Sequence, residues 1–474
     1  MSEATPMTKI QVPLWLTSTA VVVALATGGV VGYAITSPQQ SSDPNINKIV
    51  STYEAINDGY YQKPDAKKLV NGAINGMVSS LDDPYSNLLQ TDDKTSLDTT
   101  ISASFGGIGA VLKNDQSKLL IDSVTADGAA KKAGLKPNDE LVAINGKSTT
   151  GWSTSEAVAK IRGKVGTTVS VTIKRAGVNQ TFKVKRQKIT TETVAGTMDT
   201  KDKALGIIQI SSFSEPTTDQ LKATIKQLRK AGAKRFILDL RGNPGGLMPQ
   251  ALSIASMFLK NGQKIMTVEP RNGDSVTYRA GKDYDDGFKV TEPTAVLIDG
   301  QSASAAEITA AALNENRNIL LIGEKSFGKG TVQNVNSLNE TSELKLTVAK
   351  WLTPKGQWIN HKGLMPTDKV PYPAAAKITM VTKASLKLGD TGTDVRSLQQ
   401  MLAALKFNPG AVNGDYNETT ASAVKAFQAT NQLPTTGSAD AQTLQILTTK
   451  LANQLHQDDP MINKARTVLS KESN

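Results

Sequence analysis

The chain has 474 residues, of which 39% are hydrophobic and 20% charged, with no cysteine and two histidines, His361 and His456. This length predicts several globular domains, and the lack of cysteine excludes a disulfide scaffold, zinc ribbons, iron–sulfur clusters and a cysteine nucleophile. The net charge of +11 favours an anionic setting such as a membrane surface or a cell wall. The excess charge is dispersed, and no basic helix interleaved with aromatic residues indicates a nucleic-acid partner.

The amino-terminal region contains one long uncharged stretch, residues 12–35. At 1.5 Å per residue it is long enough to cross a hydrocarbon layer about 30 Å thick. We therefore expect an uncleaved transmembrane helix, with residues 1–11 in the cytoplasm. A cleaved secretory signal ending near Ala24–Ala26 is the alternative. Residues 36–45 are rich in Pro, Ser and Gln and predict a linker.

The next two segments differ in their sequence patterns. Residues 46–100 show a helical pattern with a break near Asp82, and we interpret them as a helical cap. Residues 101–188 contain short β-branched runs separated by Gly and Asn-Gly turns, which is typical of a small β-rich domain with one or two helices. Its Gly106-Gly107-Ile108-Gly109 run can present successive backbone N–H groups to an anion, although glycine clusters more often mark turns.

Residues 189–375 alternate strand and helix patterns, which predicts an α/β domain with a mixed sheet and flanking helices. The expected strands are 205–210, 235–240, 295–299 and 319–322, and the expected helices are 217–230, 247–259 and 304–314. Residues 383–451 predict a small all-α domain with two amphipathic helices. Residues 452–474 form a polar tail without an interpretable pattern.

Ser304 stands directly after a predicted buried strand, at the start of a predicted helix. The unpaired N–H groups and positive dipole end of a helix start can stabilise a developing oxyanion. Ser304 is therefore a candidate nucleophile. Considered alone, the serine is better explained as a helix cap, because Ser is among the preferred capping residues.

A second segment places Lys329 between two glycines, after another predicted strand. A lysine sheltered from water has a lowered pKa and can act as a general base. Gln333 can orient such an amine by hydrogen bonding. The alternative is a phosphate-binding glycine loop, but the first glycine of that pattern is missing and no Ser or Thr directly follows the lysine.

A third segment carries the glycine pair Gly245-Gly246 after the strand predicted at 235–240. Backbone N–H groups of glycines can supply the other half of an oxyanion hole. By itself this segment is an ordinary strand-to-helix turn.

Together the three segments resemble the carboxyl-terminal processing peptidases, or tail-specific proteases, which use a Ser–Lys dyad. The matching motifs are Ser302-Ala-Ser-Ala-Ala-Glu307, Phe327-Gly-Lys-Gly-Thr-Val-Gln333 and Asp239-Leu-Arg-Gly-Asn-Pro-Gly-Gly246, in the family's order and spacing. The resemblance covers residues 46–375. It implies that Ser304 is the nucleophile, Lys329 the base and Gln333 its supporting amide. The implied oxyanion donors are the backbones of Ala305 and of Gly245 or Gly246. Ala306 replaces the family's third serine, a position that is not the nucleophile.

The neighbouring domains resemble known binding modules. Residues 101–188 resemble a PDZ domain, in which Gly106, Gly107, Ile108 and Gly109 would bind a peptide's terminal carboxylate. Residues 383–451 resemble a peptidoglycan-binding domain. Asn417 stands where that family often has glycine, and we expect it in a left-handed conformation, which Asn tolerates well.

These features predict a membrane-anchored serine endopeptidase at the bacterial cell surface, with its catalytic body outside the cytoplasm. It would recognise the free C-termini of polypeptides, bind the cell wall and need no metal or other cofactor. The alternative is a catalytically silent, wall-tethered PDZ scaffold, and a glycan hydrolase lacks a plausible carboxylate pair. A homo-oligomer is neither required nor excluded. His361 and His456 are interpreted as incidental, and the connector 371–377 predicts a wall-binding domain that can be removed without loss of catalysis.

Overall fold

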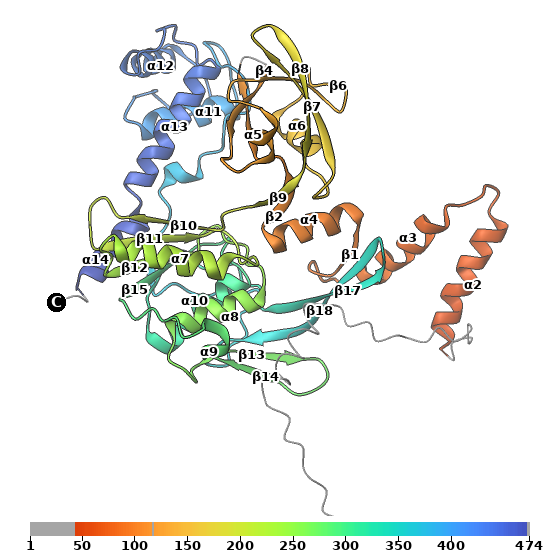
Figure 1. Cartoon of the computed structure of the whole chain (residues 1–474). Helices are drawn as coiled ribbons and strands as arrows, with labels where there is room; N and C mark the ends of the chain where they lie inside the picture. Colours follow the sequence, from red (N-terminus) through yellow and green to blue (C-terminus); the bar gives the residue numbers. More distant parts are fainter. Residues whose placement is uncertain (1–42, 116–117, 472–474) are drawn as a thin grey trace, which may run out of the picture. The chain divides into compact units, whose positions relative to one another are not determined.

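The computed structural model describes residues 43–115 and 118–471 (Figure 1). The predicted transmembrane segment at 12–35 lies outside these residues. Among the helices that are described, none is both long and apolar enough to cross a membrane. The described residues form two compact units: unit 1 comprises those up to Ile189 together with Val268–Val276 and Gly330–Leu352, and unit 2 comprises the other described residues.

Unit 1 begins with the predicted helical segment. Helices α2 (Pro44–Gly59) and α3 (Ala66–Ser79) contain no buried residue, and α4 (Thr91–Ser102) follows the short strand β1 (Asn87–Gln90). The predicted break is confirmed, because Asp82 adopts a left-handed φ of 50° between α3 and β1. The strand β1 was not predicted. It pairs antiparallel with β18, in a five-stranded sheet described below.

The β-rich part of unit 1 is a sheet in the order β3-β4-β5-β7-β8, with two helices as expected. Its elements are β3 (Ala110–Asp115), β4 (Lys118–Val124), α5 (Ala129–Ala133), β5 (Glu140–Ile144), β6 (Lys147–Ser148), α6 (Thr154–Ile161), β7 (Thr168–Arg175) and β8 (Val178–Lys185). A separate pair joins β2 (Ser104–Gly107) to β9 (Gln187–Thr190). Strand β3 lies at the edge of the larger sheet, so one side of its backbone is available for pairing.

A further sheet has the order β1-β18-β13-β14, with β17 also paired to β18. The strands are β13 (Lys264–Pro270), β14 (Val276–Arg279), β17 (Thr331–Asn339) and β18 (Ser342–Leu352). Strand β17 has mostly polar side chains, whereas β18 alternates polar and apolar residues from Glu343 to Val348. Neither strand was predicted from the sequence.

Unit 2 is built on a six-stranded mixed sheet, which confirms the predicted fold class. The sheet contains β10 (Val194–Met198), β11 (Leu205–Ile210), β12 (Arg235–Asp239), β15 (Thr294–Ile298), β16 (Leu321–Gly323) and β19 (Asp368–Lys369), in that order. Strand β10 is antiparallel to β11, and the other neighbours are parallel. Helices α7 (Thr217–Lys230), α8 (Met248–Phe258) and α10 (Ala305–Arg317) lie in the connections. Right-handed connections between strands in sequential order place these helices on one face of the sheet.

The other face of this sheet is covered by α14 (Pro460–Lys471), from the segment in which no pattern is interpretable in the sequence. Its apolar side chains Met461, Ala465 and Leu469 pack against Ile237 and Leu297 of the central strands. Alternate residues of these strands, such as Leu238, face the opposite layer, because side chains alternate along a strand. Helix α14 is therefore an integral layer of the α/β domain.

The all-α domain is inserted in the chain between β19 and α14. Its helices are α11 (Thr393–Ala404), α12 (Glu418–Thr430) and α13 (Ala441–Gln457). The apolar stripes predicted as core are largely confirmed, since Val395, Leu398 and Phe427 are almost completely buried.

The prediction for Asn417 is wrong in its physical reason. Asn417 has an extended φ of −99° and caps α12, accepting a hydrogen bond from the Thr420 N–H at 3.0 Å. Asparagine is favoured here because its side chain satisfies an unpaired helix N–H, and a left-handed backbone is not involved.

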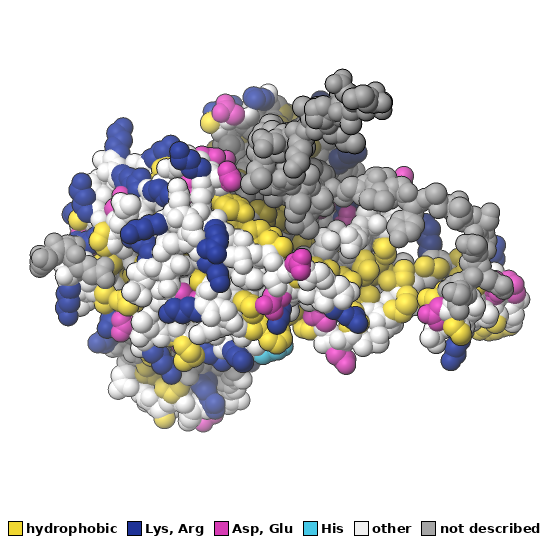
Figure 2. All heavy atoms as spheres, turned by 90° about the horizontal axis from the view of Figure 1, so that it is seen from below, with side chains coloured by type: hydrophobic (Ala, Val, Ile, Leu, Met, Phe, Trp, Pro, Cys, Tyr) yellow, Lys and Arg dark blue, Asp and Glu magenta, His cyan; other side chains and the backbone are white. Residues whose placement is uncertain are grey.

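Charged side chains are distributed as the sequence suggests. On the face shown in Figure 2, Lys and Arg are spread over the surface and do not gather in one patch. This face therefore offers no concentrated basic site.

Candidate active site

Three loops that follow neighbouring strands of unit 2 form the candidate active site. Strands β12, β15 and β16 are parallel, so their carboxyl ends meet at the same edge of the sheet. The loop after β15 is bonded to the other two. The Ala303 N–H donates to the Asn243 carbonyl at 3.0 Å, and the Phe327 N–H donates to the Ser302 carbonyl at 3.0 Å. The fold thus joins three segments that are well separated in the sequence.

Ser304 is partly exposed at the start of α10, with φ 56° and ψ −114°. A positive φ is uncommon for a residue with a side chain, and such strain costs about 1–3 kcal/mol. The nearby Ser302 is fully buried, and its hydroxyl donates to the Leu240 carbonyl at 2.8 Å and accepts from the Asp299 N–H at 2.9 Å. Ser302 therefore holds the loop, and Ser304 is the serine that a substrate can reach.

The carboxylate of Glu307, one turn into α10, links the loop that carries Ser304 (the nucleophile loop) to the loop that carries Lys329 (the lysine loop). Its Oε2 atom accepts hydrogen bonds from the backbone N–H groups of Ser304 and Lys329, each at 2.8 Å. Its Oε1 atom accepts from the Ser326 hydroxyl at 2.6 Å and from the Gly328 N–H at 2.7 Å. The backbone nitrogens of Ser304 and Lys329 are thus held against a single oxygen atom.

Glu307 is fully buried, and this burial raises the pKa of its carboxyl group above the ordinary value of 4.5, although the four hydrogen bonds oppose the shift. A glutamate one turn after a helix start can form an ion pair or lie exposed on the helix surface. In the structure it instead accepts hydrogen bonds from three backbone amides and one hydroxyl. Sequence reasoning missed this role, because nothing local to α10 indicates that the side chain is buried.

The lysine loop requires its glycines. Gly328 has a φ of 89°, and an added Cβ atom would lie 2.7 Å from the backbone nitrogen of Gly363. Gly363 has a φ of 70°, and its Cβ would lie 2.2 Å from the Ser326 carbonyl oxygen. Two backbone segments therefore pack directly on each other beneath Lys329, which is itself partly buried. His361 is exposed, and its backbone N–H donates to the Gly328 carbonyl at 2.8 Å.

The candidate oxyanion donors lie beside Ser304. A Cβ atom on Gly245 would be 2.8 Å from the Ser304 Cβ and 3.0 Å from the Ala305 nitrogen, so only glycine permits this approach. The N–H of Gly245 donates to the Asn243 side chain at 2.8 Å. In the bridge between this loop and Phe213, the Gly245 carbonyl accepts from the Phe213 N–H, and the Leu247 N–H donates to the Phe213 carbonyl. The Gly246 N–H takes part in neither bond. Because its N–H already donates to Asn243, Gly245 is a weaker candidate donor than Gly246 or Ala305.

Gln333 belongs to unit 1, on strand β17. Its side-chain amide donates to the hydroxyls of Thr331 at 2.9 Å and Thr347 at 3.1 Å. These bonds fix the orientation of the Gln333 side chain within the β17–β18 hairpin.

The predicted carboxylate-binding loop of unit 1 directly precedes the edge strand β3. The carbonyls of Gly106, Ile108 and Gly109 accept from backbone N–H groups at 3.0, 2.7 and 2.9 Å. A Cβ atom on Gly106 would lie 1.9 Å from the Gly163 carbonyl oxygen, so this glycine is required by close backbone approach. Gly107 ends β2, and Ile108 anchors the loop in the core with 2% exposure. In the part of the chain that is described, no three His, Cys, Asp or Glu side chains are grouped to hold a metal ion.

A serine at a strained helix start, beside glycine amides and a lysine loop, defines a hydrolase site of the serine peptidase class. Comparison with family models gives matches to peptidase family S41 at residues 204–370, to the PDZ domain at 98–174, to a peptidoglycan binding domain at 391–447 and to the activating protease CtpB N-terminal domain at 31–93.

Two relatives from Bacillus subtilis (strain 168) match along most of the chain. Carboxy-terminal processing protease CtpA is 45% identical over 459 residues, which cover 96% of this chain and 97% of CtpA. Carboxy-terminal processing protease CtpB is 38% identical over 411 residues, covering 85% of this chain and 84% of CtpB. The chain therefore belongs to the carboxy-terminal processing proteases of peptidase family S41, and it is a serine-type peptidase with PDZ and peptidoglycan-binding domains. The resemblance stated from its motifs is confirmed.

Proposed function

We propose that the protein is a membrane-anchored, extracytoplasmic endopeptidase in which Ser304 is the nucleophile and Lys329 the general base. The observation that carries this assignment is the shared carboxylate oxygen of Glu307, which accepts from the backbone N–H groups of both residues at 2.8 Å. A nucleophile and its base must lie within hydrogen-bonding reach in the reacting complex, and this shared contact brings their backbones close together.

In the proposed reaction, neutral Lys329 accepts the proton of the Ser304 hydroxyl while the serine oxygen attacks the scissile carbonyl carbon. The N–H groups of Gly246 and Ala305 stabilise the resulting oxyanion, helped by the dipole of α10. The protonated lysine then gives its proton to the leaving amine, and water hydrolyses the acyl-enzyme. Gln333 supports the lysine amine in this scheme.

The dyad is tested by measuring turnover of an unstructured protein with a free apolar C-terminus. We expect Ser304→Ala and Lys329→Ala each to abolish cleavage while circular dichroism stays unchanged. Lys325→Ala is the matched control, since Lys325 is an exposed lysine in the same loop. Near-normal turnover by Lys329→Ala would refute the assignment of the base. Absence of turnover by the unmodified protein itself would instead favour the alternative of a catalytically silent scaffold.

Recognition of the substrate C-terminus is assigned to the loop of Gly106, Gly107, Ile108 and Gly109. A peptide can add to the free edge of β3, which brings its terminal carboxylate to the backbone N–H groups of this loop. Amidation of the peptide's C-terminus should weaken its binding to the full chain. Equal affinities for the acid and the amide would remove the loop from substrate selection.

Residues 12–35 are assigned as a single-pass anchor, and the inserted domain as the contact to peptidoglycan. The anchor is supported by the length of the uncharged stretch, and the orientation by the presence of a wall-binding domain. We expect the protein to remain with membranes after a carbonate wash and to be digested by protease added outside intact cells. Release by carbonate would contradict the anchor.

A further inference from the structure

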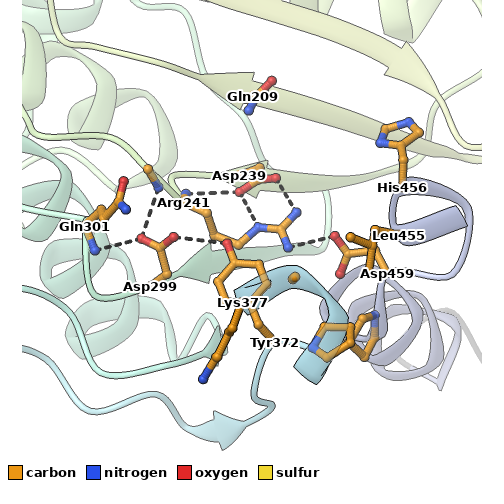
Figure 3. A pocket seen from close by; sticks show the side chains of 14 residues that line it. Gln209, Asp239, Arg241, Asp299, Gln301, Tyr372, Lys377, Leu455, His456 and Asp459 are labelled. Atoms are coloured by element: carbon orange, nitrogen blue, oxygen red, sulfur yellow. Dashed lines mark hydrogen bonds and ion pairs between the residues drawn. The ribbon is translucent and has the colours of Figure 1, made fainter. Parts of the chain in front are cut away.

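A polar cavity of about 530 Å³ in unit 2 lies beside the ends of strands β11, β12 and β15 (Figure 3). Its lining includes residues of the leading connector, 371–377, which enters the inserted domain. It also includes Asp459 of the trailing connector, residues 458–459, which joins α13 to α14. The two connectors thus meet beside the loops that carry the candidate active site.

Arg241 fastens the trailing connector to the loop after β12, which also carries Gly245 and Gly246 and is called the oxyanion loop below. The Arg241 Nη1 atom lies 2.7 Å from the Asp459 carboxylate, and its Nε and Nη2 atoms bond both carboxylate oxygens of Asp239, at 2.9 and 2.7 Å. Arg241 is largely buried, with 11% of its side chain exposed. Asp459 also caps α14, accepting from the Met461 N–H at 2.9 Å. Charge-assisted, two-pronged contacts of this kind fix position as well as contributing energy.

The leading connector is fastened to the nucleophile loop. The Tyr372 hydroxyl donates to Asp299 Oδ2 at 3.0 Å, as Figure 3 shows. The other oxygen of Asp299 accepts from the N–H groups of Gly242 at 3.0 Å and Ser302 at 3.1 Å. The guanidinium of Arg241 lies 5.8 Å from the centre of the Tyr372 ring, which links the two connectors to each other.

We propose that Tyr372 and Asp459 are positioning residues for peptide hydrolysis, so that the connectors of the wall-binding domain hold the two loops of the active site in register. Arg241 lies on the loop that leads to Gly246, and Asp299 lies on the loop that leads to Ser304. Displacement of reacting groups by about 1 Å can reduce a rate about a hundredfold. The proposal rests on the proposed function, because it assigns these loops to the nucleophile and the oxyanion donors.

The test measures kcat and KM of the full chain in detergent, with the unstructured protein substrate. Asp459→Asn keeps a residue that can cap α14 but removes the charge that faces Arg241, and Tyr372→Phe removes only the hydroxyl. We expect each variant to lower kcat about tenfold with KM nearly unchanged. Asp459→Glu should restore part of the rate. Asp458→Asn is the matched control, since the Asp458 side chain is 73% exposed, and its kcat should equal that of the unmodified chain.

Thermal melting of each variant separates positioning from folding. A kcat that falls only in proportion to the folded fraction, or that equals the value for Asp458→Asn, would overturn the positioning role. Ser304→Ala is measured alongside. If Ser304→Ala is inactive while Asp459→Asn and Tyr372→Phe are fully active, the positioning proposal fails and the proposed dyad stands. Turnover by Ser304→Ala would instead contradict the dyad itself.

Discussion

At the residue scale, the backbone nitrogens of the proposed nucleophile and base share one acceptor. The buried carboxylate of Glu307 receives four hydrogen bonds, three of them from backbone N–H groups. Because every partner is a donor, the arrangement requires an ionised carboxylate, which has acceptor capacity on both oxygens. The burial of a charge in this position is compensated by the convergence of donors.

We predict that Glu307→Gln lowers kcat by about ten- to a hundredfold, because the new NH₂ group faces donors and displaces one of the two loops. The measurement is steady-state cleavage of the unstructured substrate, with folding followed by circular dichroism. Glu315→Gln is the control on the same helix, since Glu315 accepts one backbone N–H, from Lys355, and its amide form can still accept that bond. Full activity of Glu307→Gln would show that this carboxylate does not position the dyad.

The pH dependence should separate Glu307 from Lys329. The folded-state pKa of Glu307 lies above 4.5, so Glu307 is protonated at a higher pH than an ordinary glutamate. The protonated carboxyl group carries a hydroxyl that faces hydrogen-bond donors, so one of its acceptor positions is lost. We predict loss of kcat in acid through this pKa, with a second rise in rate at higher pH as Lys329 loses its proton. The acid step should be absent from the residual activity of Glu307→Gln. A rate that is independent of pH from acid to alkaline conditions would contradict both steps.

Sequence patterns predicted Ser304, Lys329 and the glycine pair as candidate site residues, because short motifs carry them. They could not indicate that Glu307 is buried or that the Gly245 N–H is taken by Asn243. Both facts depend on contacts between loops that are brought together only by the parallel sheet. The assignment of Ser304 instead of Ser302 also gains its physical reason only from the buried hydrogen bonds of Ser302.

At the scale of elements, agreement with prediction follows the strength of the local pattern. Strand β11 and helix α7 have the predicted bounds, because one is a continuous apolar run and the other has a strong amphipathic stripe. Helix α14 was missed. Its few apolar residues are separated by polar ones, and the strands that it contacts, β12, β15 and β16, lie more than a hundred residues earlier in the chain.

Helix α14 is also held by an ion pair whose carboxylate, that of Asp199, is buried. Arg466 bonds the Asp199 carboxylate through Nε at 3.0 Å and Nη2 at 2.7 Å. Burial by itself would raise the pKa of Asp199, but the hydrogen bonds from Arg466 and from backbone N–H groups outweigh it and lower the pKa below 3.8. The stabilisation is therefore present above the ordinary pKa of Asp and is lost as the pH falls through the lower folded-state value.

We predict that Arg466→Ala destabilises the attachment of α14 by about 3 kcal/mol, because it leaves Asp199 buried without its partner. Amide hydrogen exchange in β12 and β15 checks this prediction, since these central strands lie under α14. Protection there should fall about a hundredfold at neutral pH.

Lys464→Ala is the matched control on the same helix. Lys464 forms an ion pair with Asp368 at 3.1 Å, but its side chain is 40% exposed, so the change should be within about 1 kcal/mol. If Arg466→Ala and Lys464→Ala gave the same exchange rates, the pair of Arg466 and Asp199 would not hold the helix.

At the scale of the whole molecule, the wall-binding domain interrupts the peptidase domain. The chain leaves the sheet after β19, forms α11 to α13 and returns as α14. The expectation that this domain can be cut off after Tyr372 is therefore revised, because such a truncation also removes the layer that covers Ile237 and Leu297.

We predict that truncation after Tyr372 abolishes peptidase activity and causes aggregation, since it exposes one apolar face of the sheet. Replacement of residues 378–454 by a short Gly-Ser linker should keep the activity. The flanking residues Ala376, Lys377 and Leu455 line one cavity, so a short linker can join them. Sedimentation with purified peptidoglycan, measured beside cleavage, should be lost in both variants. An active truncated chain would show that α14 is dispensable.

The position of α14 also determines when the peptidase can be completed during synthesis. Strands β11 to β16 emerge from the ribosome long before residues 461–469, so one face of the sheet stays uncovered until those residues have been made. Contacts between residues so distant in sequence form late in folding. The inserted domain, whose own core is built from residues 386–451, can fold earlier. The order of synthesis therefore delays the appearance of a competent protease until the wall-binding domain has left the ribosome.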